Sequence, residues 1–362
     1  MKKLILYYLL RNLLLRKLIP FLHLALSLLI GFIGAIIFIY LELPLPWLLG
    51  SITAMAIASR LTFIPVKNPK MLSPPARSIL GLMIGSAFTP AIIQYIGNYL
   101  VSLVLIIPFV IIIAICGVFY YWKILGHDKI TSFFSAMPGG LLEMIAIGES
   151  MGANIYKITL FQSTRLLLIV FSLPFIIEIV GGISLDGNRT ITTPIRDVAI
   201  VDMFILVALA VIGVFLAKKL KISAPFIIGP MIVSMIAFLN GWVTSRPPDE
   251  IIKLVQIILG TSVGFVFRGV PFKEIITTIL STLGYFVILL AVTALFTFIV
   301  LQITHFDLLS IILAFSPGGQ AEINLIAIVI GVNLPYVAIH HVFRLFLVMG
   351  IAPLFAKRFK NS

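Results

Sequence analysis

The chain has 362 residues, of which 61% are hydrophobic and 11% are charged, and its formal net charge is +13. Soluble domains are about half apolar and about a quarter charged, so this composition excludes an ordinary soluble protein and predicts a polytopic helical membrane protein. Long continuous apolar runs exclude a transmembrane β-barrel, and the single cysteine, Cys116, excludes a disulfide framework or a cysteine-based zinc site within one chain.

Residues 1–19 form a basic, leucine-rich segment. Its five basic side chains are Lys2, Lys3, Arg11, Arg16 and Lys17. No small-residue cleavage site follows, so a removed signal peptide is not expected. We expect a cytoplasmic interfacial helix that leads into the first membrane span.

Two similar sets of apolar segments follow. In the first set, the sequence predicts spans at about 21–41, 47–60, 76–96 and 98–122, then an interrupted apolar segment and a longer span that ends near 180. Residues 182–197 are rich in Gly, Asn, Thr and Pro and form the expected linker. The predicted organisation is therefore a first transmembrane repeat over 20–181, a second over 198–356, and a cytoplasmic tail over 357–362.

The interrupted segment has the sequence Ser-Ala-Met-Pro-Gly-Gly-Leu-Leu-Glu at 135–143, and Ala-Phe-Ser-Pro-Gly-Gly-Gln-Ala-Glu occupies 314–322. Proline removes a backbone donor and glycine frees the backbone, so a continuous helix is not expected at either place. In hydrocarbon, such a break survives only where protein or a water-filled cavity surrounds it. A membrane carboxylate beside such a break is therefore a candidate functional group.

The two stretches belong to an internal repeat. Pro138 and Pro317 are separated by 179 positions (317 − 138), and so are Glu143 and Glu322 (322 − 143). The same offset pairs Gly34 with Gly213, Gly50 with Gly229, Asp128 with Asp307 and Arg165 with Arg344. Recurring charged residues are hard to explain by composition alone, so we expect two structurally equivalent halves.

The basic residues predict the sidedness of the chain and account for its positive charge without nucleic acid. The basic N-terminus is expected in the cytoplasm, and Lys218, Lys219 and Lys221 place the end of the second half's first span there too. The first spans of the two halves then cross in opposite directions, which requires inverted repeats with an odd number of crossings. We expect about five spans per repeat plus one re-entrant helical hairpin with a Pro-Gly-Gly tip. Both termini would be cytoplasmic, in a cell inner membrane.

Two basic residues, Arg165 and Arg344, lie inside predicted spans. Glu143 and Arg165 are each 11 positions from Asn154 (154 − 143 and 165 − 154), where the hairpin turns into the last span, so similar depths are expected. Each repeat thus predicts a carboxylate–guanidinium pair near the midplane. Two interpretations remain open: a structural clasp that fixes each hairpin, or a pair shared with a substrate or coupling ion. The candidate binding residues are Pro138, Gly139, Gly140, Glu143, Arg165, Pro317, Gly318, Gly319, Gln320, Glu322 and Arg344.

Other polar residues receive simpler predictions. Asp128 and Asp307 precede the hairpins and are expected to be helix N-caps. His340 and His341 precede Arg344 by four and three positions, which leaves a proton-relay role open. Adjacent helical positions lie about 100° apart, so the two are not expected to face one cavity, and packing or interface roles are favoured. Gln162 is polar enough to line a site.

The duplicated Pro-Gly-Gly-x-x-Glu segments and the later arginines resemble the AbrB-like bacterial inner-membrane family, which differs from the soluble DNA-binding proteins of the same name. Members are also labelled as candidate ammonia monooxygenases or regulators of gene expression. The resemblance covers nearly the whole chain. The inverted layout with Gly-rich re-entrant tips also looks like that of elevator-type carboxylate transporters, an analogy at the level of the fold.

Three functions compete. A secondary transporter of a small organic anion fits two alternating conformations around a midplane site. A membrane-embedded regulator of gene expression or a scaffold without transport activity is the alternative. An oxidative metalloenzyme needs clustered ligands, and the five histidines are scattered. We expect no enzyme activity and no cofactor apart from a coupling H⁺ or Na⁺. The expected partners are the lipid bilayer and a small anionic solute; nucleic acid is not expected, and a homodimer is left open.

Overall fold

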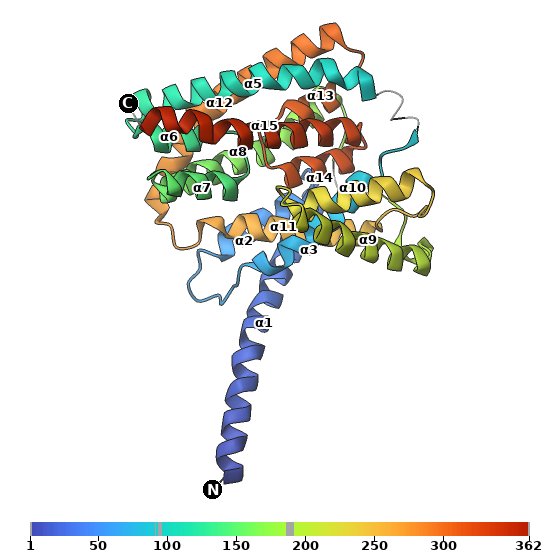
Figure 1. Ribbon diagram of the computed structural model, residues 1–362. Helices are drawn as coiled ribbons and strands as arrows, with labels where there is room; N and C mark the ends of the chain where they lie inside the picture. The colour runs from blue at the N-terminus through green and yellow to red at the C-terminus, as the bar shows by residue number, and fades with distance from the viewer. Residues whose placement is uncertain (1, 91, 93–95, 186–191, 361–362) are drawn as a thin grey trace.

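The computed structural model describes residues 2–90, 92, 96–185 and 192–360, and every regular element in these ranges is a helix. Figure 1 shows their arrangement. The helices are α1 (Lys2–Tyr40), α2 (Ser51–Ala58), α3 (Ser73–Gly85), α5 (Tyr99–Phe119), α6 (Lys129–Ala136), α7 (Leu141–Ser150), α8 (Ile155–Gly181), α9 (Ile200–Lys219), α10 (Pro225–Leu239), α11 (Asp249–Gly264), α12 (Phe272–Ile303), α13 (Leu308–Phe315), α14 (Gln320–Ile330) and α15 (Leu334–Lys360). Short π-helical turns, η1 (Pro46–Gly50) and η4 (Tyr120–Ile124), precede α2 and follow α5.

Seven helical segments in the described ranges are long and apolar enough to cross a membrane: Ile19–Tyr40, Tyr99–Ile124, Ile155–Gly181, Ile200–Lys219, Asp249–Phe267, Phe272–Ile303 and Leu334–Ala352. The expected span at 47–60 and its copy correspond to shorter apolar helices, Pro46–Ala58 and Pro225–Leu239. The span expected at 76–96 is represented by α3, which ends at Gly85, and part of the remainder lies outside the described residues. The all-helical membrane class is confirmed, whereas five spans per half stays a prediction.

The N-terminal segment is continuous with the first span. One helix, α1, runs from Lys2 to Tyr40 with Pro20 inside it, and no break separates residues 2–19 from the rest. In Figure 1 the N-terminal part of this helix projects away from the other helices, with the N-terminus at its far end. The apolar part, Ile19–Tyr40, matches the expected first span.

The two halves share one order of elements. The hairpin helices α6, α7 and α8 begin at Lys129, Leu141 and Ile155, and α13, α14 and α15 begin 179 positions later in each case (308 − 129, 320 − 141 and 334 − 155). Helices α10 and η1 likewise begin 179 positions apart (225 − 46). The repeat that the sequence predicts is therefore present in the secondary structure.

The helices nevertheless pack into two groups that each combine both halves. Helices α1, α2, α3, α9, α10 and α11 pack on one another, and we call them the scaffold group. Helices α5 to α8 and α12 to α15 form the second set, the hairpin group. The hairpin group occupies the upper part of Figure 1 and the scaffold group the lower part. The two groups meet where α3 packs against α14 and α15.

Glycines allow the scaffold helices to approach backbone to backbone. A Cβ on Gly34 of α1 would lie 2.3 Å from the carbonyl oxygen of Gly50, and a Cβ on Gly213 of α9 would lie 2.6 Å from the carbonyl carbon of Gly229. A second pair of contacts crosses between the halves: Gly81 of α3 abuts the carbonyl of Ile227, and Gly260 of α11 abuts that of Leu48. Small residues permit this packing where no water drives helices together. The halves are therefore interlocked rather than side by side.

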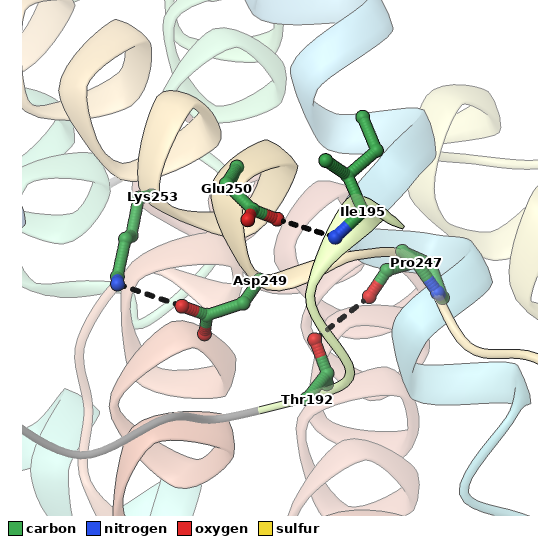
Figure 2. Close-up of polar contacts among 6 residues, drawn as sticks. All are labelled: Thr192, Ile195, Pro247, Asp249, Glu250 and Lys253. Atoms are coloured by element: carbon green, nitrogen blue, oxygen red, sulfur yellow. Dashed lines mark hydrogen bonds and ion pairs between the residues drawn. The ribbon is translucent and has the colours of Figure 1, made fainter. Parts of the chain in front are cut away.

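The end of the linker is fixed to the start of α11 (Figure 2). The hydroxyl of Thr192 donates to the carbonyl of Pro247 at 2.9 Å, and the backbone N–H of Ile195 donates to the carboxylate of Glu250 at 2.9 Å. Lys253 and Asp249 form an ion pair at 2.7 Å on the same turn. These contacts hold residues 192–197 against the scaffold group.

Candidate functional site

Each Pro-Gly-Gly stretch interrupts a helix, as the sequence predicts. Helix α6 ends at Ala136 and α7 begins at Leu141, while α13 ends at Phe315 and α14 begins at Gln320. The residue before each first arm is a helix N-cap, because a carboxylate oxygen of Asp128 accepts from the N–H of Thr131 and one of Asp307 from that of Ser310, both at 2.8 Å. The predicted breaks and both predicted caps are confirmed.

The two arms of each break fold back on each other. The backbone N–H of Asn154, just after α7, donates to the hydroxyl of Thr131 at the start of α6, at 2.9 Å. The copy is a 3.0 Å bond from the N–H of Asn333 to the hydroxyl of Ser310. Since the end of the second arm returns to the beginning of the first, both segments are helical hairpins with the Pro-Gly-Gly stretch at the tip.

The arginines lie at the depth of the tips, as predicted, and bind the ends of the first arms. Arg165 Nη1 donates to the carbonyls of Ala136 and Met137, at 3.2 and 3.1 Å. Arg344 donates through Nη1 to the carbonyl of Ser316 at 2.6 Å and through Nη2 to that of Gly318 at 3.1 Å. Both side chains are about 95% buried, with 5% and 4% exposed. A helix C-terminus carries partial negative charge, so a guanidinium there is stabilised.

The predicted pairing of these arginines with the glutamates is wrong. Within the described residues, neither Arg165 nor Arg344 forms an ion pair, whereas Arg196 pairs with Asp197 and Lys253 with Asp249. The physical reason is that a sequence shows where the carboxylates are. It does not show that the last backbone carbonyls of an interrupted helix lack partners within that helix. Those carbonyls are nearer to the guanidinium groups and take their hydrogen bonds.

The glutamates instead turn back over the second glycine of each tip. Oε2 of Glu143 lies 2.1 Å from where a Cβ of Gly140 would stand, and Oε2 of Glu322 lies 2.1 Å from the same point on Gly319. Both glycines have ordinary φ values, −65° and −69°, so backbone freedom does not explain them. Glycine is required at both positions because the glutamate carboxylate occupies the space that a Cβ would fill, beside the positive N-terminus of the second arm.

Each tip is thus electrically compensated from both sides. An arginine neutralises the carbonyl end of the first arm, and a glutamate faces the amide end of the second.

Each tip also contacts a helix of the other half: a Cβ on Gly139 would meet Val348 of α15 at 2.9 Å, and one on Gly318 would meet Ile169 of α8 at 3.1 Å. These contacts are 179 positions apart (348 − 169). Both tips therefore lie between α8 and α15.

Several buried polar atoms around the tips have no hydrogen-bond partner among the described residues. They are Ser135 Oγ, Ser163 Oγ, Thr164 Oγ1, Arg165 Nε, Gln320 Nε2 and Asn324 Oδ1. Because more than about 90% of buried polar groups in proteins are paired, unpartnered atoms of this kind mark places where a ligand or water belongs. The sequence prediction named Arg165 and Gln320 but missed Asn324, although an asparagine two positions after Glu322 in an apolar run was a usable signal.

Tyr285 is a further site residue that the sequence did not indicate. Its hydroxyl donates to the carbonyl of Ala136 at 2.9 Å, beside Arg165, and its side chain is fully buried. It comes from α12, in the other half of the chain, and its equivalent position holds Ile106 (285 − 179). A tyrosine in a long apolar span has no pattern that distinguishes it from a packing residue.

The two adjacent histidines point to different partners. His340 bonds the carbonyl of Tyr336 through Nδ1 at 2.7 Å and lies 2.9 Å from the Ser102 hydroxyl through Nε2. His341 faces Arg344 at 2.8 Å instead. The prediction that they do not share one cavity is confirmed.

An open cavity of about 530 Å³ lies at the base of the second hairpin, away from the tips. It is lined by the start of α5 and the end of α12, with Tyr99, His305 and Asn333 among its polar residues. The hydroxyl of Tyr99 donates to the side-chain oxygen of Asn333 at 3.3 Å. None of the tip residues lines this cavity.

The chain is similar to known proteins, and the family match includes both hairpins. A family model described as "Transition state regulatory protein AbrB" matches residues 47–360. A Bacillus subtilis (strain 168) protein described as "Uncharacterized protein YhjN" is 27% identical over 295 residues, 76% of this chain and 76% of that protein. An Escherichia coli (strain K12) protein described as "Putative regulator AbrB" is 23% identical over 328 residues, 88% of this chain and 91% of that protein.

Proposed function

Because the chain belongs to the AbrB family and carries long apolar helices of membrane-spanning length, we propose that it is a secondary transporter of a small organic anion. The observation that carries the proposal is the meeting of two interrupted helices, two buried arginines and a cluster of unpartnered polar atoms at the hairpin tips. Broken helices whose ends meet between repeats are typical of secondary-transporter sites.

The topology that we propose is an inverted repeat in a cell inner membrane. Each hairpin would be re-entrant, entering and leaving on one side, and both termini would be cytoplasmic. The basic residues at the end of α9, Lys218 and Lys219, support this sidedness, because positive charge is retained on the cytoplasmic side. The two hairpins would then enter from opposite sides and bring their tips together near the midplane.

Alternating access would come from movement of the hairpin group against the scaffold group. Both tips and both arginines belong to the hairpin group, so the site travels as one unit. The scaffold group is fixed internally by the glycine contacts of α1 with η1 and of α9 with α10. The cavity beside Asn333 supports an approach for solute at the base of the second hairpin.

The charges favour an anion together with a cation. The guanidinium groups and the amide ends of α7 and α14 attract an anion. Glu143 and Glu322 are the candidate groups for a coupling H⁺ or Na⁺. Because each tip is already compensated, entry of an anion with a cation preserves the balance of charge, whereas either alone disturbs it.

A second candidate function is a membrane-embedded regulator of gene expression or a scaffold. The observation that favours it is the word "regulator" or "regulatory" in the descriptions of the family model and the Escherichia coli relative. Such a protein would respond to a ligand without moving it across the membrane.

Uptake by purified protein in proteoliposomes separates these functions. We expect uptake of at least one labelled carboxylate, such as succinate, pyruvate or citrate, driven by a proton or sodium gradient. Glu143→Gln and Glu322→Gln should each reduce gradient-driven uptake. Transport that is unaffected by both substitutions would remove the glutamates from the mechanism. Absence of uptake for every solute in a broad anion panel would refute transport and favour the regulator.

A further inference from the structure

The residue three positions before each arginine differs between the halves. Gln162 precedes Arg165, and His341 precedes Arg344, 179 positions later (341 − 162). The two side chains bind equivalent carbonyls, one in each first arm (313 − 134 = 179): Gln162 Nε2 donates to that of Phe134 at 2.6 Å, and His341 Nε2 contacts that of Leu313 at 3.0 Å. The two side chains differ, however, in what their other polar atom contacts.

His341 fixes Arg344. A carbonyl only accepts, so the bond to Leu313 requires the proton of the imidazole on Nε2. An arginine only donates, so Nδ1 of the same ring accepts from Arg344 Nη2 at 2.8 Å. Nη2 of Arg344 also donates to Gly318, and Nη1 donates to Ser316. Both terminal nitrogens of this arginine are therefore engaged by protein.

Arg165 is held differently, because Gln162 stands where the second half has the histidine. Its Nη1 donates to the carbonyls of Ala136 and Met137. Its Nε is buried and has no hydrogen-bond partner among the described residues. Nε and Nη2 form one edge of the planar guanidinium, and two parallel donors on one edge match the two oxygens of a carboxylate.

The surroundings of Arg165 are also more polar. The Tyr285 hydroxyl donates to the carbonyl of Ala136, which Arg165 also binds, and the Tyr121 ring packs on the Tyr285 ring at 5.2 Å between centroids. The Tyr121 hydroxyl is fully buried and has no partner among the described residues. Around Arg344, the equivalent positions hold Val300 (121 + 179) and Ile106 (285 − 179), which offer no hydroxyl.

We propose that the two arginines have different roles: Arg165 binds a carboxylate of the solute through its Nε–Nη2 edge, assisted by the Tyr121 hydroxyl, while Arg344 is a positioning residue held by His341. This inference rests on the proposed anion transport and assigns its binding group. The symmetric tips then form an asymmetric site, with the anion held at the first hairpin. His341 maintains the shape of the second hairpin.

The test compares Arg165→Gln with its copy Arg344→Gln. Arg344→Gln should lower the thermal unfolding midpoint of the purified protein more than Arg165→Gln, because it removes more protein–protein hydrogen bonds.

Reaction of native membranes with phenylglyoxal, followed by mass spectrometry, should modify Arg165 in preference to Arg344. In proteoliposomes, Arg165→Gln should reduce succinate or pyruvate uptake by about tenfold or more, and Tyr121→Phe should raise the KM with less effect on kcat.

The outcomes separate the two proposals. Equal destabilisation by both arginine substitutions, or preferential modification of Arg344, would overturn the division of roles whether or not uptake is seen. Preferential modification of Arg165 and the expected order of stability, without uptake of any carboxylate, would support the division of roles and refute transport. Succinate uptake that survives Arg165→Gln would remove this arginine from the binding site.

Discussion

Replacement of Gly140 by alanine tests how the tips are built. The new Cβ would stand 2.1 Å from Oε2 of Glu143 and 2.8 Å from its Cδ, and the three nearest atoms all belong to that glutamate. The backbone itself accepts alanine, because φ at Gly140 is −65°. The carboxylate therefore has to leave the N-terminus of α7. A charge at such a position is worth about 0.3–1 kcal/mol when exposed and up to about 2 kcal/mol when partly buried.

Glu143 is half-buried, so we expect Gly140→Ala to cost about 1–2 kcal/mol more in the natural protein than in a Glu143→Ala background. The general preference for glycine over alanine at an N-cap is the same in both backgrounds and cancels in this cycle. The assay is reversible unfolding of the purified protein in detergent micelles. Gly97→Ala is the control, because among the described residues no atom beyond its own chain neighbours lies within 4 Å of its Cβ position. Equal costs in the two backgrounds would show that the carboxylate does not occupy the glycine's space, and the account of the tip would fail.

Three further predictions follow from the same structure. Gly34→Ala should cost more than Gly140→Ala, since its Cβ would meet backbone at 2.3 Å rather than a flexible side chain; similar midpoints of unfolding would contradict this. Cysteines placed beside Gly152 and Gly331 should be labelled from opposite sides of the membrane, and same-side labelling would end the inverted-repeat proposal. Burial and then the nearby Lys157 ammonium lower the pKa of His127, whose ordinary value is 6.5, so folding favours its neutral form and stability should fall as the pH drops through 6.5. Lys157→Met should weaken that pH dependence, as measured by unfolding between pH 5 and pH 8, and an unchanged slope would contradict the assignment.

The sequence predicted the hairpins well because their causes are local. Proline and two glycines break a helix wherever they stand, and Asp128 and Asp307 cap the arms through atoms three residues away. The depth of Arg165 also followed from counting residues along two antiparallel helices. Its partners did not, because the carbonyls of Ala136 and Met137 become available only when the arm ends there.

Packing between distant segments was beyond the sequence. The offset of 179 indicated two equivalent halves, but nothing in it showed that α3 would pack on α10 and α11 on α2. The unpartnered Nε of Arg165 is similarly invisible, since it depends on which atoms surround the guanidinium in three dimensions. Asymmetry within a repeat appears only when the environments of equivalent residues are compared.

The reciprocal glycine contacts have a consequence for the origin of this chain. Gly81 packs on the carbonyl of Ile227, and its copy Gly260 packs on that of Leu48, so each half supplies a surface that only the other half covers. A half-length ancestor with this architecture would have left that surface bare as a monomer. Covering that surface would require a second copy of the half. Two separately expressed halves, divided within the linker, should accordingly reassemble when they are produced together and fail to persist when either is produced alone.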